Sequence, residues 1–463
     1  MGIYRSDVLV VGGGLGGVAA AIAAARAGAR TILMERNTCL GGVATAGMCC
    51  SVFNCFFSHD RELVVKGIPL EVTDMLADAG GPGQSWRRHK GHVIYDLELA
   101  KHKLDQLVLE NGIELLLESV VADAVMENGK LAGVRFISKG GPGTVLAKAV
   151  VDATGDADVA WLAGAPVKVT PRERAPSSYC FRMGNVDLDR FVGYFRENPS
   201  QYPEKMDIEW SLREALAQYD ENGTFLFPHG GGMQMDIMKR GLETGDLKPS
   251  FGVYDTMAAT QMHGIRSLGI MHIVTGFTKV DLDPLQISRA ITDGRGMSYH
   301  AAEFMRKRMP GFENAFICGL AENLGIRTSR SIDGDFVFTQ EMKTMPSRFS
   351  DAIGQGVVES HAKLHNADDA WSAQVFGNEI YQIPYRALIP REVDGLIMGA
   401  GRSASVSDAS PFLLRVMVTT MTVGQAAGIA AAISAGGGME LRWVDVPEIQ
   451  KELSRQGVDL ARE

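Results

Sequence analysis

Three glycines near the start of the chain, Gly12, Gly14 and Gly17, follow a β-branched apolar run and open an alanine-rich segment. At this spacing the first glycine permits a tight turn, the second has no Cβ to hold a pyrophosphate away, and the third lets a helix pack close to a sheet. Glu35 ends a second apolar run roughly 20 residues further on, where a carboxylate can accept hydrogen bonds from two ribose hydroxyls. These residues predict a dinucleotide-binding site, and the acid disfavours a 2′-phosphate.

Such a site needs a strand, a turn and a helix in immediate succession. Residues 8–11 are continuously apolar and predict a buried strand, residues 15–27 predict the helix, and residues 31–34 predict the next strand. The free N–H groups and the dipole of the helix would then point at the phosphates.

Two later loops also combine glycine with small residues. Gly41 and Gly42 lie in a second glycine-rich segment, where the backbone can run against something flat and large. A strand predicted over residues 147–151 runs into the turn 152–156, which contains carboxylates. We expect these loops and the first glycine turn to converge on one ligand that is longer than a mononucleotide.

The C-terminal region returns to the opening pattern. An apolar strand over residues 395–400 precedes Gly401-Arg402, and residues 415–435 predict a long helix. Residues 424–428 of that helix are small enough for close packing. A second strand–loop–helix unit of this kind predicts a nucleotide-binding domain that is split by an insertion.

The region between the two parts is richer in charged and aromatic residues. A strand near residues 269–278 and a helix across residues 283–309 indicate an inserted α+β domain, which is the best candidate for a wall facing the substrate. We expect a first nucleotide-binding part at 1–170, the inserted domain at 171–382, the second nucleotide-binding part at 383–440 and a C-terminal tail at 441–463.

Several polar side chains are candidates for substrate chemistry. The groups that could move a proton are His229, His263, His272 and Asp408, although each is more typical of a structural or solvated residue. Arg327 and Arg330 stand three residues apart beside a strand, where they could hold a substrate carboxylate or secure a domain interface. The interface is the favoured interpretation.

Composition narrows the class of protein. The net charge is −9 and no block of lysine or arginine stands out, which argues against a nucleic-acid or anionic-membrane surface. The apolar stretch 416–435 is interrupted by glycines and predicts a buried helix rather than a membrane span. None of the six cysteines forms a CxxC pair, so we expect no metal site, and reduced thiols in a cytoplasmic protein without a secretory signal. A thiol close to a redox cofactor is the alternative.

Taken in order, these segments resemble the FAD-dependent oxidoreductases of the glutathione-reductase-like superfamily, in particular those with fumarate-reductase-like two-domain architecture. The matching segments are residues 12–17, 35–36, 40–45, 152–156, 310–312, 324–327, 329–330, 383–386, 400–402, 415–417 and 424–428. The resemblance implies an α/β fold, with a split Rossmann-like FAD-binding domain of the GR2 type and an inserted α+β substrate domain.

The resemblance also implies where FAD would bind. The pyrophosphate would lie on the glycine turn, the ribose on Glu35, the adenine near Arg36 and Val121, and the flavin beside residues 41–45. The start of the last helix would stabilise negative charge on the flavin. The implied cofactor-binding residues are Gly12, Gly13, Gly14, Gly16, Gly17, Glu35, Arg36, Gly41, Gly42, Ala44, Thr45, Val121, Gly155, Asp156, Gly401, Arg402, Met417 and Val418.

The activity expected from this resemblance is transfer of a hydride from a small organic substrate, at a C–H bond next to oxygen or nitrogen, to flavin N5. Reduction of an activated alkene is the main alternative, followed by an electron-transfer subunit, a hydroxylating monooxygenase and a non-catalytic nucleotide-binding module. The sequence leaves open the substrate, the electron acceptor and whether the chain forms a homo-oligomer.

Overall fold

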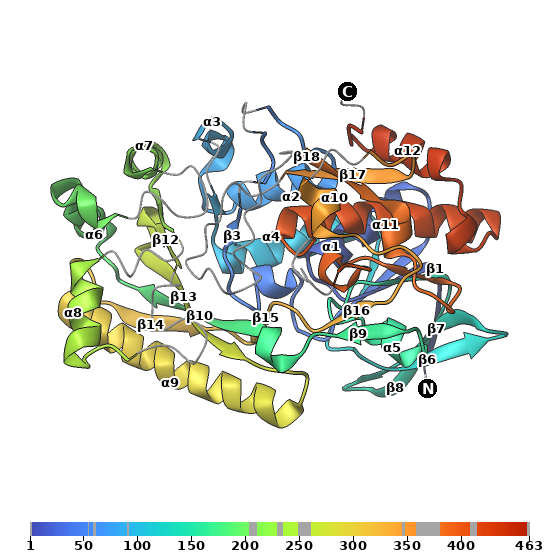
Figure 1. Ribbon diagram of the computed structural model, residues 1–463, viewed down its shortest axis with the longest axis horizontal. Coiled ribbons are helices and arrows are strands. Elements are labelled where there is room, and N and C mark those ends of the chain that lie inside the picture. The colour runs from blue at the N-terminus through green and yellow to red at the C-terminus, as the bar shows by residue number, and fades with distance from the viewer. Residues whose placement is uncertain are drawn as a thin grey trace.

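The computed structural model describes residues 2–53, 55–58, 62–89, 92–202, 211–228, 235–248, 261–344, 348–357, 380–407 and 414–460. Two sheets lie along the long axis of the molecule, the second at the left and the first at the right of Figure 1. Each sheet has its own group of buried apolar residues. Helices α1 and α11 pack on the first sheet, and the long helix α9 packs on the second.

The first sheet is built mainly from parallel strands, in the order β5-β2-β1-β8-β7-β6, with β19 beside β8. Its strands are β1 (Gly2–Val11), β2 (Thr31–Met34), β5 (Glu114–Leu116), β6 (Val120–Glu127), β7 (Lys130–Ser138), β8 (Gly141–Asp152) and β19 (Leu396–Met398). Strand β1 pairs in parallel with both β2 and β8. Strand β19 comes from the C-terminal region and joins β8 in parallel. The split Rossmann-like domain is therefore confirmed.

Two helices from opposite ends of the chain cross over this sheet, α1 (Leu15–Arg26) and α11 (Met417–Gly437). A Cβ added to Gly424 would lie 2.0 Å from the carbonyl oxygen of Gly16, and one added to Gly428 would lie 2.0 Å from that of Ala20. Only glycine fits at these two positions of α11, as the small residues in the sequence predicted. Within the described residues, α11 is the single helix long and apolar enough to cross a membrane, and 83% of its most apolar window is buried in the protein.

Further helices and two-stranded antiparallel sheets complete this part of the molecule. Asp96 caps α4 by accepting a hydrogen bond from the Glu98 N–H at 2.8 Å. The elements are α2 (Ile68–Ala77), α3 (Trp86–His89), α4 (Leu97–Glu110), α5 (Asp158–Leu162), α10 (Gln340–Thr344), α12 (Val446–Arg455), β3 (Ser51–Val52), β4 (Val93–Ile94), β9 (Val167–Val169), β16 (Arg330–Ile332), β17 (Ala352–Val357) and β18 (Ile380–Pro384).

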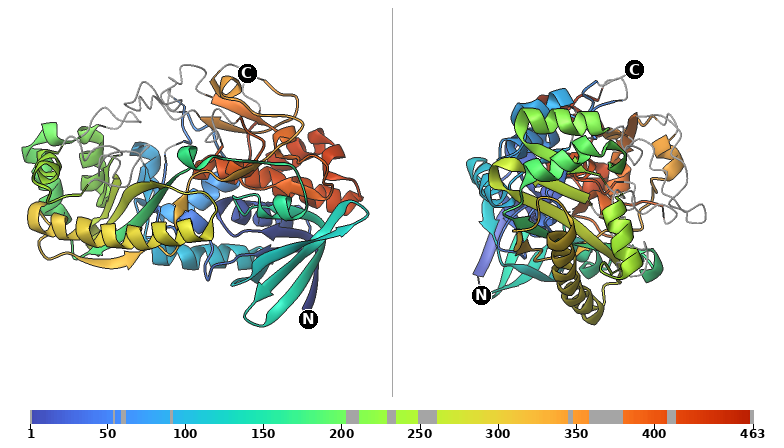
Figure 2. Two further views of the ribbon diagram at one scale, coloured as in Figure 1. Left: turned by 60° about the horizontal axis from the view of Figure 1, so that its bottom comes forward. Right: turned by 90° about the vertical axis from the view of Figure 1, so that its left-hand side faces the viewer.

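The second sheet is antiparallel, in the order β11-β12-β13-β10-β14, with β15 beside β10. Its strands are β10 (Pro176–Gly184), β11 (Thr224–Phe227), β12 (Gln261–Ile265), β13 (Ile270–Lys279), β14 (Phe316–Leu320) and β15 (Gly325–Ile326). Its helices are α6 (Leu188–Glu197), α7 (Leu212–Asn222), α8 (Asp236–Thr244) and α9 (Pro284–Arg308). Figure 2 shows α9 running along one side of this sheet. Asp283 caps α9, and the helix lies within the predicted span of residues 283–309.

The chain leaves the second sheet well before residue 382, where the sequence placed the end of the insertion. Strand β16 already pairs with β9 of the first region, and the hairpin of β17 and β18 packs on α11. Helix α12, in the predicted tail, packs on α11 and β17. Residues 330–357 and 441–460 therefore lie with the nucleotide-binding part rather than apart from it.

Candidate functional site

The first glycine turn has the geometry that its residues predict. Gly12 has φ +105°, and a Cβ there would lie 2.5 Å from the Ala153 carbonyl oxygen. A Cβ on Gly17 would lie 1.8 Å from the Gly12 carbonyl oxygen, so only glycine fits. A Cβ on Gly14, in contrast, would meet no atom within 4 Å. The turn is thus closed on the sheet side and open at the N-terminus of α1, whose first turn holds no acidic residue.

The carboxylate of Glu35 is held beside this turn. The side chain is buried, and its Oε2 accepts a hydrogen bond from the Gly13 N–H at 2.5 Å. Its Oε1 accepts from the backbone N–H of Asn37 at 2.8 Å and from the side-chain amide at 2.6 Å. These contacts fix the orientation of Glu35 and leave Oε2 able to accept one further hydrogen bond.

A cavity of about 290 Å³ opens between the glycine turn, β6 and α5. Four residues that the sequence assigned to one ligand line it together: Gly12, Glu35, Arg36 and Val121. The other lining residues are Val11, Met34, Ser119, Val120, Thr154, Asp158, Trp161, Leu162 and Arg330.

Trp161 and Arg330 form the far wall of this cavity. The Trp161 side chain is 55% exposed, and the Arg330 guanidinium carbon lies 5.0 Å from the ring centroid. Arg330 donates from Nε to the Asp156 carbonyl oxygen at 2.9 Å and pairs through Nη2 with Asp158. These contacts fit the favoured interface role of Arg330 and place it at the nucleotide cavity. Trp161 was not singled out from the sequence, although it closely follows the 152–156 turn.

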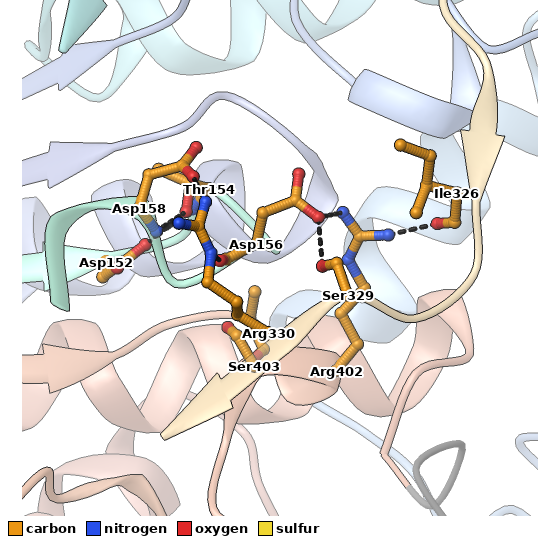
Figure 3. A network of polar contacts seen from close by, with 10 residues as sticks. Asp152, Thr154, Asp156, Asp158, Ile326, Ser329, Arg330, Arg402 and Ser403 are labelled. Atoms are coloured by element: carbon orange, nitrogen blue, oxygen red, sulfur yellow. Dashed lines mark hydrogen bonds and ion pairs between the residues drawn. The ribbon is translucent and has the colours of Figure 1, made fainter. Parts of the chain in front are cut away.

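Figure 3 shows how a second arginine joins three distant segments of the chain. Arg402 donates from Nη2 to Asp156 Oδ1 at 2.7 Å and from Nη1 to the Ile326 carbonyl oxygen. Ser329 donates its hydroxyl to the same Asp156 oxygen. A Cβ on Gly155 would lie 2.8 Å from Arg402 Nε, so a larger residue would disturb this contact. The Arg402 guanidinium therefore holds the 152–156 turn against the C-terminal strand–loop–helix unit.

A family model described as FAD dependent oxidoreductase matches residues 7–453 of the chain. This chain belongs to the FAD-dependent oxidoreductase family. It is an enzyme with FAD as its cofactor. Its α/β fold with a mainly parallel first sheet agrees with the fold expected from the sequence.

Individual relatives match over shorter stretches. The digeranylgeranylglycerophospholipid reductase of Thermoplasma acidophilum is 30% identical over 194 residues, which cover 40% of this chain and 48% of that protein. The thiamine thiazole synthase of Methanococcus aeolicus is 32% identical over 164 residues, covering 33% and 57%. The chain thus spans about half the length of these relatives. A solved geranylgeranyl bacteriochlorophyll reductase-like protein from Thermoplasma acidophilum aligns with 98% of this chain and 83% of its own at 14% identity, with a TM-score of 0.44.

The residues around the cavity fit the adenosine half of FAD. Open space at Gly14 suits a pyrophosphate at the start of α1, and the Glu35 carboxylate suits ribose hydroxyls. The exposed Trp161 ring offers an apolar face to adenine. Helix α11 begins at Met417, so its N-terminal end includes both residues expected there, Met417 and Val418.

The second glycine segment lies directly against the first. The Gly41 N–H donates to the Gly13 carbonyl oxygen at 2.8 Å, and a Cβ on Gly42 would lie 3.1 Å from the Gly14 Cα. Gly41 and Gly42 both have positive φ, at +99° and +56°. Within the same loop the Thr45 hydroxyl donates to the Leu40 carbonyl oxygen. A ligand on the glycine turn could therefore continue along residues 41–45, as the FAD resemblance predicts.

The proton-transfer candidates fall into two groups. His263 and His272 are buried in the second sheet, while His229 and Asp408 lie outside the described residues. Within the described residues no group of three or more His, Cys, Asp or Glu side chains could hold a metal ion.

The cysteines at the junction of the two sheets are poor candidates for reactive thiols. Cys49, Cys50 and Cys180 are all free, and burial raises the pKa of each thiol. A raised pKa keeps these groups protonated at neutral pH, whereas nucleophilic cysteines need a lowered one. This favours the reduced, unreactive thiols over a thiol that takes part in redox chemistry.

Trp161→Ala is expected to weaken binding of FAD to the apoprotein by about 5- to 100-fold, because stacking on a nucleobase is worth about 1–3 kcal/mol. Fluorescence titration with FAD measures this, and FMN, which lacks adenosine, should bind both proteins equally. Trp443→Ala is the control, since Trp443 is 72% exposed and does not line the cavity. Equal loss of FAD and FMN binding would contradict an adenine contact.

Asp158 is expected to make stability fall as the pH rises from about 4 to 6. Burial, with Asp156 and Asp152 nearby, raises the pKa of Asp158 from 3.8 to about 6. The folded chain therefore holds a proton that the unfolded chain has already lost in this window. The stability of Asp158→Asn relative to wild type should grow by about 1–3 kcal/mol between pH 4 and pH 7. Denaturant unfolding at several pH values measures it, and a constant difference would show an ordinary pKa.

Proposed function

We propose that this oxidoreductase removes a hydride from a C–H bond next to oxygen or nitrogen in a small organic substrate. FAD, when bound, supplies the acceptor for that hydride at flavin N5. The protein then has to hold the substrate, exclude water and accept or release a proton.

The observation that carries this proposal is the contact between residues 41–50 and the second sheet. The Glu322 N–H, just after β14, donates to the Ala46 carbonyl oxygen at 2.9 Å. Cys50 Sγ lies 3.7 Å from Nδ1 of His263 on β12. The segment that is expected to lie beside the flavin is therefore in contact with the inserted domain. A substrate at this junction would meet residues from both sheets.

Two guanidinium groups lie near the same junction. The charges of Arg327 and Arg415 oppose the rise in pKa that burial gives to Cys49, so both lie close to that thiol. We infer that they hold an anionic group of the substrate. For Arg327 this is the carboxylate-binding role that the sequence offered beside the favoured interface role, whereas Arg330 lines the cavity next to Trp161.

Reduction of an activated alkene is the second candidate. It is supported by relatives that are named reductases, including the digeranylgeranylglycerophospholipid reductase of Thermoplasma acidophilum. The same substrate position would serve either direction of hydride transfer.

Anaerobic mixing of the purified holoenzyme with hydroxy acids, sugars and amines tests the first proposal. Loss of the oxidised-flavin absorbance with one donor class is expected, and dithionite gives the fully bleached reference. If no donor bleaches the flavin, the dithionite-reduced enzyme is mixed with carbonyl-conjugated alkenes. Recovery of absorbance without oxygen in that experiment would replace the oxidase or dehydrogenase proposal by the reductase.

A further inference from the structure

Three polar residues form one row across the second sheet. Arg182 on β10 is the register partner of His272 on β13, and His272 is the partner of His263 on β12. Directly opposed residues in antiparallel strands share a face of the sheet. The flanking residues point to the other face, where they belong to the apolar group of the second sheet: Phe181, Met183, Met271, Ile273 and Met262. The row therefore faces away from that core.

The face that carries the row is covered by residues that precede the second sheet in the chain. Ser51 Oγ lies 3.2 Å from His263 Nε2, and Cys50 Sγ lies 3.7 Å from Nδ1. His92 directly precedes β4, which pairs with β3 next to Ser51 and contacts β12. Side chains from the second sheet and from the β3–β4 pair thus enclose the histidines, at the same junction where residues 41–50 end.

The three imidazoles are buried and uncharged. His263 is 0% exposed, His272 is 1% exposed and His92 is 3% exposed. Burial is the main reason that the pKa of each is lowered to about 3. Proximity to His263 contributes for His92 and His272, and the Arg182 guanidinium also contributes for His272. Neutral imidazole has one N–H donor and one acceptor nitrogen, so each ring can make two hydrogen bonds.

Among the three rings, only His263 has a partner for each ring nitrogen within the described residues. Both nitrogens of His263 face Cys50 and Ser51, whereas both nitrogens of His92 and both of His272 have no hydrogen-bond partner among the described residues. Leaving a buried polar atom without a partner is unfavourable, because the atom has lost its hydrogen bonds to water and gained none in return. Such atoms are retained in native proteins mainly where a ligand, a water molecule or a reaction uses them.

The charges around the three histidines limit the kind of ligand that can bind there. The Arg182 guanidinium pairs through Nη2 with Glu98 at 3.0 Å, so its charge is already engaged by a carboxylate that Lys101 also contacts at 3.1 Å. The neutral rings offer donors and acceptors together but no positive charge. This combination suits a hydroxyl or a carbonyl oxygen better than a carboxylate.

We propose that His92 and His272 form a binding site for an uncharged oxygen group, a hydroxyl or carbonyl, of the substrate. The site binds secondary alcohols and ketones through the two imidazoles, one from each region of the chain. This inference rests on the proposed function for the substrate's position and adds its chemical class.

Nitrogen-15 NMR of the FAD-loaded enzyme with ring-labelled histidine tests the site directly. The probes are 2-propanol and acetone, with acetate as the charged control and the exposed His102 as the internal reference. Single His92→Phe and His272→Phe variants assign the two sets of resonances. We expect both sets to shift with saturation on addition of 2-propanol or acetone, while acetate and His102 show no such response.

If the His92 and His272 resonances of the wild-type enzyme do not shift, the proposal is overturned. Bound water is then the partner of the two rings. In the double phenylalanine variant, addition of 2-propanol or acetone should shift none of the remaining histidine resonances, including those of His263. If that variant does not fold, the double asparagine variant, which keeps donors and acceptors, should retain binding within about 10-fold. Flavin bleaching is independent of these shifts. Shifts without bleaching would reject only the direction of the reaction, and bleaching without shifts would reject only this site.

Discussion

Glu35→Ala is expected to lower the affinity of the apoprotein for FAD by roughly 10- to 150-fold. A hydrogen bond to a charged acceptor contributes about 1.5–3 kcal/mol, and the variant would lose the one that Oε2 can still accept from the ribose. The carboxylate is already oriented by the Gly13 N–H and by Asn37, so little ordering is needed when the ribose binds. The FAD content of the purified protein and titration of the apoprotein with FAD measure the effect.

The matched control for this experiment is Glu114→Ala, which removes an exposed carboxylate from the neighbouring strand β5. That variant should bind FAD as the wild type does. Thermal unfolding of both apoproteins separates loss of binding from loss of fold, because Glu35 also accepts hydrogen bonds within the protein. Full FAD occupancy in a folded Glu35→Ala protein would remove Glu35 from the ribose site.

Gly424→Ala is expected to destabilise the protein by about 1–3 kcal/mol, because its Cβ would lie 2.0 Å from a backbone carbonyl oxygen of α1. The two helices can relieve this overlap only by moving apart along their whole crossing. Since both helices begin at the predicted cofactor site, FAD affinity should fall as well. Denaturant unfolding and FAD titration measure the two effects.

Gly436→Ala, in the same helix, provides the control. A Cβ at this exposed position would meet no atom within 4 Å, and alanine favours a helix over glycine by about 1 kcal/mol. This variant should be as stable as the wild type or slightly more stable. A Gly424→Ala protein with the same unfolding midpoint as Gly436→Ala would refute the close-packed crossing.

Much of the FAD-binding half could be predicted from the sequence because its signals are local. The strand, turn and helix around Gly12 and Gly17 depend on residues close together in the chain, where a positive φ or a close approach demands glycine. The cap of α4 at Asp96 and the span of α9 follow from local patterns in the same way.

The tertiary structure decided which distant residues meet. Trp161 and Arg330 share a wall of the nucleotide cavity although they are far apart in the chain. His263 and His272 become neighbours through the strand register, and His92 joins them from another region. The roles of His229 and Asp408 stay predictions.

By itself the sequence therefore determined the dinucleotide-binding turn, the split fold and the close packing of the last helix, because glycine spacing and apolar periodicity encode backbone geometry locally. FAD as the cofactor followed from the resemblance of these segments to a known family. Only the tertiary structure decided which groups pair with Arg330 and which side chains surround the buried histidines. Those contacts depend on strand register and on packing between segments far apart in the chain, which local patterns do not specify.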